Sequence, residues 1–377
     1  MKQSLDIAIL GLSLTSSWVN GHATTYRGLA RELARRGHRV TFYERDAGNR
    51  DLPEPEFCRV VLYHSLDELV RNHERALGDA DLVIVGSYVP DGAKIIDWIT
   101  TFVRGVLAFY DIDTPVTLEA IRAGTCDYLH RRQIPWFDLY LSFTGGPVLL
   151  TIERELGSPA ARPLYCSFDP ASYYPETTPL RWDLGYIGTY SADRQPVLER
   201  LLVKPARAWR GGRFVVAGPQ YPASIVWPPN VERIQHVHPD EHRRFYNAQR
   251  FTLNVTREPM VRLGYSPSVR LFEAAACAVP IVSDSWPGLD DFFEPGREIV
   301  LCESPEQVVE TIHDMPEEER RAIGARARER VLRNHTAAHR ALELERYYTE
   351  AVLLGRLRPR TAERPLPEHD ERVEARI

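Results

Sequence analysis

The sequence predicts an α/β protein built from two doubly wound domains that face each other across a cleft. Three observations predict this class. Apolar runs typical of buried strands alternate with helical patterns along the chain. This alternation breaks once, near residues 166–180, and then begins again. The length of 377 residues also suits two domains of ordinary size.

The first half contains the first series of strands and helices. Between residues 24 and 36, Tyr26, Leu29 and Leu33 recur with the period of a helix, and Gly37 is typical of its end. A second helix is expected at residues 66–77. Apolar runs predict strands at residues 5–12, 39–44, 81–87, 106–113 and 137–143.

The segment 166–180 is predicted to link the two domains, because it is rich in proline and has little periodicity. We therefore divide the chain into a first domain at residues 1–165 and a second domain at residues 181–335. A last helix is expected within residues 336–355. The remaining residues, 356–377, carry several prolines and many charges and predict a flexible tail.

The second half repeats the alternation. Gly188 and Gly218 directly follow apolar strand-like runs, as expected where a strand turns into a helix. Strands are predicted at residues 182–188, 213–218, 251–256 and 280–284. Helices are predicted at residues 193–202, 240–248, 268–277, 305–313, 317–334 and 337–354.

Composition argues against two classes of partner. The formal net charge is −5, so there is no basic excess that would favour nucleic acid. The apolar run at residues 5–12 is too short to cross a membrane and lacks the features of a signal peptide. We therefore expect a cytoplasmic protein without a transmembrane segment.

The segment 264–284 is the strongest candidate for a phosphate site. Ligands of open α/β sheets bind beyond the carboxyl ends of the strands. Gly264 allows a tight turn, and Ser266 and Ser268 are suited to a helix start. The amino end of a helix offers free N–H groups and a positive dipole end, which favour a diphosphate. Arg257 and Arg270 would add positive charge.

Glu273 lies five residues beyond Ser268, in a helix of small residues that allows a ligand to approach closely. Its carboxylate could accept hydrogen bonds from both hydroxyls of a ribose. The alternative is an ordinary buried helix in which Glu273 pairs with Arg270 at a spacing of three residues. The combination of glycine turn, serines, arginine and glutamate favours the binding role.

A second phosphate candidate is the turn that follows the strand at residues 182–188. Gly188, Thr189, Ser191 and Arg194 could surround a phosphate with backbone amides, hydroxyls and a cation. A strand followed by glycine and a helix is common in α/β proteins, so an ordinary turn explains this segment equally well.

These motifs resemble a known family, the GT-B glycosyltransferases of the CgeB-like, spore-maturation type. In the second half the resemblance lies in residues 186–202, 245–284 and 285–300. In the first half it lies in residues 18–46, 108–118 and 139–149. Altogether it covers nearly all of residues 5–350.

The resemblance implies a GT-B fold of two Rossmann-like domains, with the nucleotide of the donor on the second domain. It also implies that the last helix crosses back to the first domain. Glu273 matches the glutamate that holds the ribose, and residues 235–238, which include His236 and Val237, match the loop against the base. Many retaining members carry another glutamate eight residues earlier, where this chain has Tyr265, and this departure leaves the stereochemistry open.

The implied activity is transfer of a sugar from a nucleotide-diphosphate sugar to a hydroxyl or other nucleophile of an acceptor that the sequence does not identify. The nucleotide sugar is a co-substrate, and no separate cofactor is expected. Two alternatives stay open. One is a sugar-nucleotide epimerase or hydrolase of the same fold, and the other is a relative that binds nucleotide sugars without catalysis.

Inverting transfer needs a base that takes the proton of the acceptor. His22 follows the first strand in a loop expected at the cleft, although a loop histidine is also a common helix-capping residue. Asp111 and Asp113 end another strand and could orient His22, act as the base, or only make turn and cap hydrogen bonds.

Asp111 and Asp113 also form an Asp-x-Asp pattern, which binds a metal in the other large class of glycosyltransferases. Two doubly wound halves favour GT-B enzymes instead, in which a metal is not required. We therefore expect no metal site, with a helix dipole and arginines stabilising the leaving diphosphate.

Overall fold

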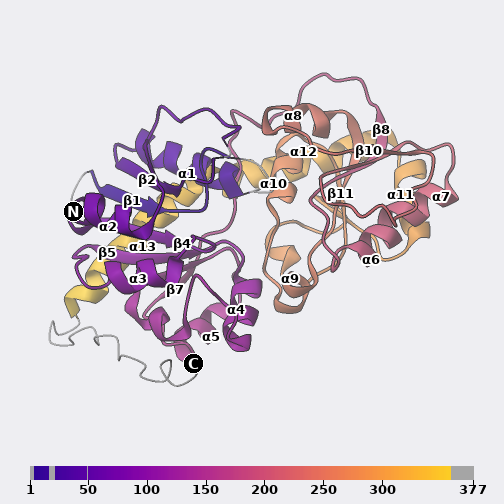
Figure 1. Cartoon of the computed structure of the whole chain (residues 1–377). Coiled ribbons are helices and arrows are strands. Elements are labelled where there is room, and N and C mark those ends of the chain that lie inside the picture. Colours follow the sequence, from indigo (N-terminus) through magenta and orange to yellow (C-terminus); the bar gives the residue numbers. More distant parts are fainter. Residues whose placement is uncertain (1–3, 17–21, 49, 358–377) are drawn as a thin grey trace.

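The computed structural model describes residues 4–16, 22–48 and 50–357 (Figure 1). Two parallel β-sheets, one of seven strands and one of six, form the centres of its two halves. Helices cover both sheets, and the two halves lie side by side (Figure 1). This arrangement confirms the predicted fold class. None of the described helices combines the length and the apolar character needed to cross a membrane.

The first sheet has the order β3-β2-β1-β4-β5-β6-β7, and all of its pairs are parallel. Ile7 of β1 pairs with Val40 of β2 and with Leu82 of β4. The order of strands therefore reverses between β1 and β4, where ligands of doubly wound sheets bind. The strands are β1 (Asp6–Leu10), β2 (Arg39–Arg45), β3 (Arg59–Tyr63), β4 (Leu82–Gly86), β5 (Val106–Asp111), β6 (Leu139–Ser142) and β7 (Ala161–Pro163).

The two faces of the first sheet bury alternate residues of each strand, as the pleat requires. Ile7 and Ile9 of β1 face one apolar cluster, which also contains Leu33 of α1. Ala8 and Leu10 face the other cluster. The helices of this half are α1 (His22–Arg35), α2 (Leu66–Gly78), α3 (Gly92–Ile99), α4 (Thr114–Ala123), the 3-10 helix η1 (Arg131–Trp136) and α5 (Val148–Arg154).

The second sheet has the order β10-β9-β8-β11-β12-β13, and its pairs are also parallel. Its order reverses between β8 and β11. The strands are β8 (Trp182–Ile187), β9 (Phe214–Ala217), β10 (Val231–Ile234), β11 (Gln249–Asn254), β12 (Ile281–Ser283) and β13 (Val300–Leu301).

The helices of the second half follow the predicted series, with one extension and two further helices, at residues 258–263 and 289–291, that the sequence did not predict. The helix predicted at residues 193–202 is a run from 195 to 208, and a π-helical turn, η2 (Glu199–Val203), separates α6 (Gln195–Leu198) from α7 (Lys204–Ala208). The other helices are α8 (Pro239–Asn247), α9 (Glu258–Leu263), α10 (Val269–Ala276), the 3-10 helix η3 (Leu289–Asp291), α11 (Pro305–Asp314) and α12 (Glu317–Asn334).

The last helix, α13 (Ala337–Leu357), returns from the second half to pack against α1 of the first (Figure 1). Glu345 on α13 accepts hydrogen bonds from Arg36 Nε at 2.6 Å and from His38 Nε2 at 2.7 Å. The Tyr347 hydroxyl donates to the Pro163 carbonyl at 2.9 Å. The expected crossing helix is thus confirmed.

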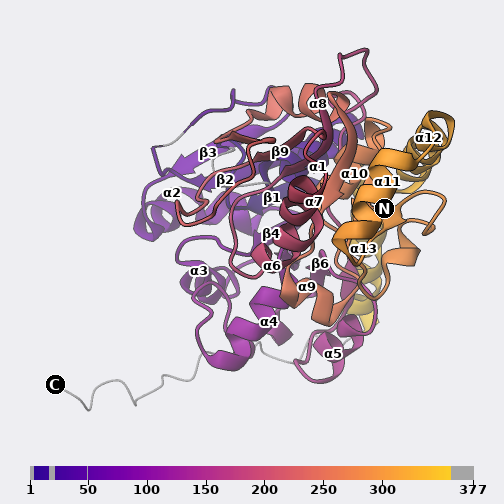
Figure 2. The same cartoon turned by 90° about the vertical axis from the view of Figure 1, so that its right-hand side faces the viewer.

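A second connection joins the halves through the segment before α10. The Thr144 and Ser266 hydroxyls are 2.6 Å apart, and the Gly145 amide donates to the Tyr265 carbonyl at 3.0 Å. Figure 2 shows α9 of the second half beside α4 of the first, where Arg262 pairs with Glu119. The carboxyl ends of the two sheets are thereby held close to one another.

Candidate functional site

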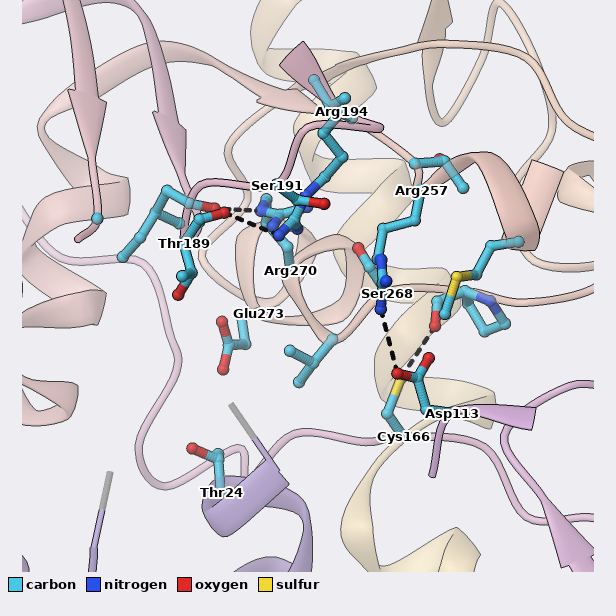
Figure 3. Close-up of a pocket in the computed structure, with 18 of the residues that line it drawn as sticks. Thr24, Asp113, Cys166, Thr189, Ser191, Arg194, Arg257, Ser268, Arg270 and Glu273 are labelled. Atoms are coloured by element: carbon cyan, nitrogen blue, oxygen red, sulfur yellow. Dashed lines mark hydrogen bonds and ion pairs between the residues drawn. The ribbon is translucent and has the colours of Figure 1, made fainter. Parts of the chain in front are cut away.

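A cavity of about 540 Å³ lies between the two sheets, at the carboxyl ends of their strands (Figure 3). The first half contributes residues at the start of α1 and after β5 and β6. The second half contributes residues after β8 and β11 and the amino end of α10. The cavity is therefore where the topology of two doubly wound sheets places a ligand.

The amino end of α10 opens into this cavity, as the sequence predicts. Ser268 occupies the capping position, but its hydroxyl does not cap the helix. It donates instead to Asn254 Oδ1, at 2.8 Å. The first N–H groups of a helix have no partner within it. In α10 the Leu271 N–H donates to the Ser268 carbonyl, which leaves those of Val269 and Arg270 available to an anion, and the dipole favours negative charge there.

Arg270 lies in the first turn of α10 and is fixed by three contacts. Its Nε donates to the Ile187 carbonyl at 2.6 Å, and its Nη1 donates to Asn254 Oδ1 at 3.1 Å. Its guanidinium lies over the ring of Tyr186, 4.9 Å from the centroid. Its Nη2 lies beside Gly188, where a Cβ would be only 3.0 Å away. Gly188 is thus needed for the close approach of this cation.

Glu273 lines the cavity although only 4% of it is exposed. Its Oε2 accepts a hydrogen bond from the Tyr246 hydroxyl at 3.0 Å. The alternative pairing with Arg270 does not occur, and Arg270 Nε and Nη1 donate to Ile187 and Asn254 instead. Glu273 can therefore accept hydrogen bonds from a ligand, as the ribose role requires.

The turn after β8 also lines the cavity. Thr189, Ser191 and Arg194 all face it, and Arg194 Nη2 donates to the Thr189 carbonyl at 2.8 Å (Figure 3). Arg194 Nε is buried without a described partner. With Arg257 and Arg270, this residue makes the second half the cationic wall of the cavity.

His236 and Val237 line another part of the same wall, as expected for the loop against a base. His242 of α8 supports this loop by donating from Nε2 to the Val237 carbonyl at 3.1 Å. Burial lowers the pKa of His242, so its ring is neutral and holds the loop without adding charge.

Asp113 is the carboxylate of the first half that faces the cavity. Its Oδ2 accepts from the Tyr88 hydroxyl at 2.7 Å and from Arg257 Nη1 at 3.1 Å. Burial and then Asp113 raise the pKa of Tyr88, which keeps this phenol protonated as a donor. Burial alone would lower the pKa of Arg257, but Asp113 and Asp193 outweigh it and raise that pKa.

Asp111 does not line the cavity, although it lies only two residues away from Asp113. It is fully buried, and its carboxylate accepts from the Thr117 hydroxyl at 2.7 Å and the Tyr140 hydroxyl at 2.6 Å. Burial raises its pKa to about 6. The structure thus gives Asp111 the turn-stabilising role and separates it from the cavity.

Two other candidates, Gly264 and Tyr265, are also not among the residues that line the cavity. Tyr265 has a φ of 52°, and its ring lies so close to Gly146 and Gly288 that a Cβ on either glycine would be 2.3 Å from it. This ring therefore joins the two halves. His22 is the first residue of α1, and its side chain lies outside the described residues.

Most of the residues predicted for the donor site line the cavity, including Ser266, but the prediction missed several of their neighbours. Their signals were weak, because each is a common polar or aromatic residue next to a predicted element. The missed residues that line the cavity include Thr24, Thr25, Thr144, Cys166, Tyr190, His242, Tyr246 and Thr256.

Two doubly wound parallel sheets that enclose such a cavity, tied by a returning last helix, define the GT-B fold of glycosyltransferases. Residues 194–346 match the family model described as glycosyl transferase-like. The fold is thus that of GT-B glycosyltransferases, and the matched segment is similar to glycosyl transferase-like proteins. A search of curated proteins found no match.

Solved structures of this fold are similar over nearly the whole chain. Sucrose-phosphate synthase from Thermosynechococcus elongatus is 15% identical with a TM-score of 0.64, covering 94% of this chain and 100% of its own. HepE from Anabaena in complex with UDP-glucose is 12% identical with a TM-score of 0.64, covering 92% and 100%. An alpha-glucosyltransferase in complex with UDP-glucose and DNA is 14% identical with a TM-score of 0.67, covering 92% and 100%.

Proposed function

We propose that the protein transfers a sugar from a nucleoside-diphosphate sugar, held by the second half, to a nucleophile held by the first. The observation that carries this proposal is the shared opening of the α10 amino end, Arg270 and the buried Glu273 into one cavity. A diphosphate fits the amino end of α10 and the Arg270 cation. A ribose fits the Glu273 carboxylate, five residues after Ser268.

The cationic wall of the second half also stabilises the leaving group in this proposal. When the bond between sugar and phosphate breaks, negative charge develops on the diphosphate. The N–H groups of α10 and the cations Arg194 and Arg270 are already oriented toward the cavity, so little reorganisation is needed as that charge develops. The proposal assigns this role to the chain itself and requires no metal.

Asp113 is the proposed proton acceptor on the opposite wall. It lies on the first half, faces the cavity and has an oxygen, Oδ1, that is not used by Tyr88 or Arg257. The pair with Arg257 holds the carboxylate at the cavity wall, where an acceptor hydroxyl can approach it. His22 remains the alternative base, because its position at the start of α1 is next to the cavity residues Thr24 and Thr25.

UDP-glucose is the first donor to test, because two of the similar structures hold it. The proposal does not include nucleic acid as the acceptor, although one of those structures contains DNA, since this chain has a net charge of −5. We place the protein in the CgeB-like subgroup and in the cytoplasm on the sequence features described above.

The test is equilibrium binding of UDP, GDP and dTDP, followed by turnover of the matching nucleotide sugars with and without a panel of hydroxyl acceptors. We expect one nucleotide to bind and Glu273→Ala to weaken that binding about tenfold or more, because ribose hydrogen bonds to a charged group are lost. Glu310→Ala, at an exposed position of α11, is the control and should bind normally.

Lack of binding to all three nucleotides would overturn the proposal. Turnover of the donor without any acceptor, to an epimer or a free sugar, would replace transfer with one of the alternative reactions.

A further inference from the structure

Asn254 lies at the end of β11, is only 1% exposed and is not part of the cavity lining. It nevertheless contacts two residues that do line the cavity, Ser268 and Arg270. Its Oδ1 accepts from Ser268 Oγ at 2.8 Å and from Arg270 Nη1 at 3.1 Å. An amide oxygen has two acceptor sites, so both are used on residues of the proposed diphosphate site.

The nitrogen of the same amide anchors it to the sheet. Asn254 Nδ2 donates to Ser283 Oγ at 3.0 Å and to Thr256 Oγ1 at 3.2 Å. Both of these hydroxyls use their own protons elsewhere. Ser283 donates to the Asp284 carbonyl at 2.9 Å, and Thr256 donates to Asp284 Oδ1 at 3.0 Å.

These hydrogen-bond directions allow only one orientation of the Asn254 side-chain amide. If its oxygen and nitrogen exchanged places, Nδ2 would face the cationic donor of Arg270, and Oδ1 would face two hydroxyls whose protons are already committed. A buried donor or acceptor without a partner is costly. The acceptor side of Asn254 is therefore fixed toward α10.

Two consequences for the cavity follow. The Ser268 hydroxyl is held toward Asn254 and accepts no N–H group of α10, so the helix N–H groups ahead of Leu271 stay open. Because Arg270 gives Nη1 to Asn254 and Nε to Ile187, its remaining nitrogen, Nη2, is held beside Gly188 at the cavity. Both effects prepare an anion site before any ligand arrives.

We propose that Asn254 is a positioning residue, which presents the α10 amino end and Arg270 to the diphosphate of the donor. This inference rests on the proposed function and assigns to Asn254 a role in phosphate affinity only. The nucleoside part of the donor is assigned to Glu273 and to the loop of His236 and Val237, and the hydrogen bonds of Asn254 go instead to Ser268, Arg270, Ser283 and Thr256.

The test compares one nucleoside diphosphate, chosen as the tightest binder to the wild-type protein among UDP, GDP and dTDP, with its own nucleoside. In Asn254→Ala the dissociation constant of the diphosphate should rise about tenfold, because a hydrogen bond that fixes a charged group is lost. Binding of the nucleoside, followed by NMR at millimolar concentration, should stay within about twofold.

Gln249→Ala is the matched control. Gln249 has a buried side-chain amide at the opposite end of β11. Its Nε2 donates to the Phe245 carbonyl at 2.9 Å, away from the cavity. It should lower stability without changing the ratio of diphosphate to nucleoside affinity. Ser283→Ala, which removes only one anchor of the Asn254 amide, gives a milder version of the effect if Asn254→Ala does not fold.

A double variant decides how Asn254 acts. In an Arg270→Ala background, adding Asn254→Ala should cost clearly less diphosphate affinity than it does in the wild-type background, because the two residues act together. Equal losses of diphosphate and nucleoside binding, or full additivity with Arg270→Ala, would overturn the inference. Failure of the wild-type protein to bind any of the three nucleotides would instead contradict the proposed function.

Discussion

Two aspartates that are separated by one residue have opposite surroundings in this protein. Asp111, the last residue of β5, points into the first half and is fully hydrogen-bonded there. Asp113, just before α4, faces the cavity and Arg257. The sequence could place both after a strand, but it could not choose between them. The direction of Asp111 depends on the nearby Thr117 and on Tyr140 of β6, which is 29 residues away in the chain.

Asp113→Asn should therefore lower kcat with little effect on donor binding. We expect a loss of about 10²- to 10⁴-fold, the usual contribution of a general base, while the dissociation constant of the nucleotide stays within a few-fold. Steady-state kinetics and binding titration measure the two quantities. Asp193→Asn, which removes the other carboxylate partner of Arg257, is the control. A nearly unchanged kcat in Asp113→Asn would assign the base role elsewhere, with His22 next to be tested.

Asp111 should make stability depend on pH in the direction opposite to that of an ion-paired carboxylate. Its pKa rises from 3.8 to about 6 on burial, so the folded state binds the proton more tightly than the unfolded state. This group therefore stabilises the fold fully below about pH 4, and the contribution is lost as the pH rises through about 6.

The variant Asp111→Asn cannot ionise and should be relatively more stable at higher pH. Relative to the wild-type protein, its free energy of unfolding should improve by about 1 to 2 kcal/mol between pH 5 and pH 7.5. Urea denaturation at the two pH values measures this change. The same difference at both pH values would show that Asp111 does not titrate in this range.

At the scale of elements, α10 shows what could be predicted and what could not. The serines, the glycine turn and the small residues predicted a helix at 268–277, and the structure has it at Val269–Ala276. The partner of Ser268 could not be predicted, because Asn254 reaches it only through the packing of β11 beside the helix. A polar residue inside the apolar run at 251–256 was the only signal in the sequence.

Gly188 tests the coupling between β8 and α10. In Gly188→Ala the new Cβ would lie 2.6 Å from the Tyr186 hydroxyl and 3.0 Å from Arg270 Nη2, so Arg270 has to move. We expect diphosphate affinity to fall about tenfold, because a charged hydrogen bond loses its geometry. Gly211→Ala is the control, since its Cβ would meet nothing closer than 3.5 Å. Unchanged affinity in Gly188→Ala would show that Arg270 does not contact the phosphates.

At the scale of the whole molecule, the two doubly wound sheets were predictable because their central strands are long apolar runs. The short edge strands β3, β7, β10 and β13 were not, because two to five residues give little periodicity. The contacts between the halves were also outside the reach of the sequence. Tyr265 illustrates this, since its ring fits between Gly146 of one half and Gly288 of the other.

Gly146→Ala should weaken that contact between the halves. Its φ is 67° and a Cβ would lie 2.3 Å from the Tyr265 ring, so backbone strain and a clash add together. Gly124→Ala is a matched control with a φ of 68° and nothing within 4 Å, and it reports the strain alone. We expect Gly146→Ala to cost about 1 to 3 kcal/mol more than this control in urea denaturation. Equal costs would show that the ring moves aside freely.

The most direct test of the whole account is a crystal structure with the nucleoside diphosphate that binds most tightly. The account predicts the diphosphate between the α10 amino end and the turn at Gly188, within hydrogen-bonding distance of Arg270, and the ribose hydroxyls on Glu273. A nucleotide bound away from the cavity, or bound there with its ribose turned away from Glu273, would contradict it.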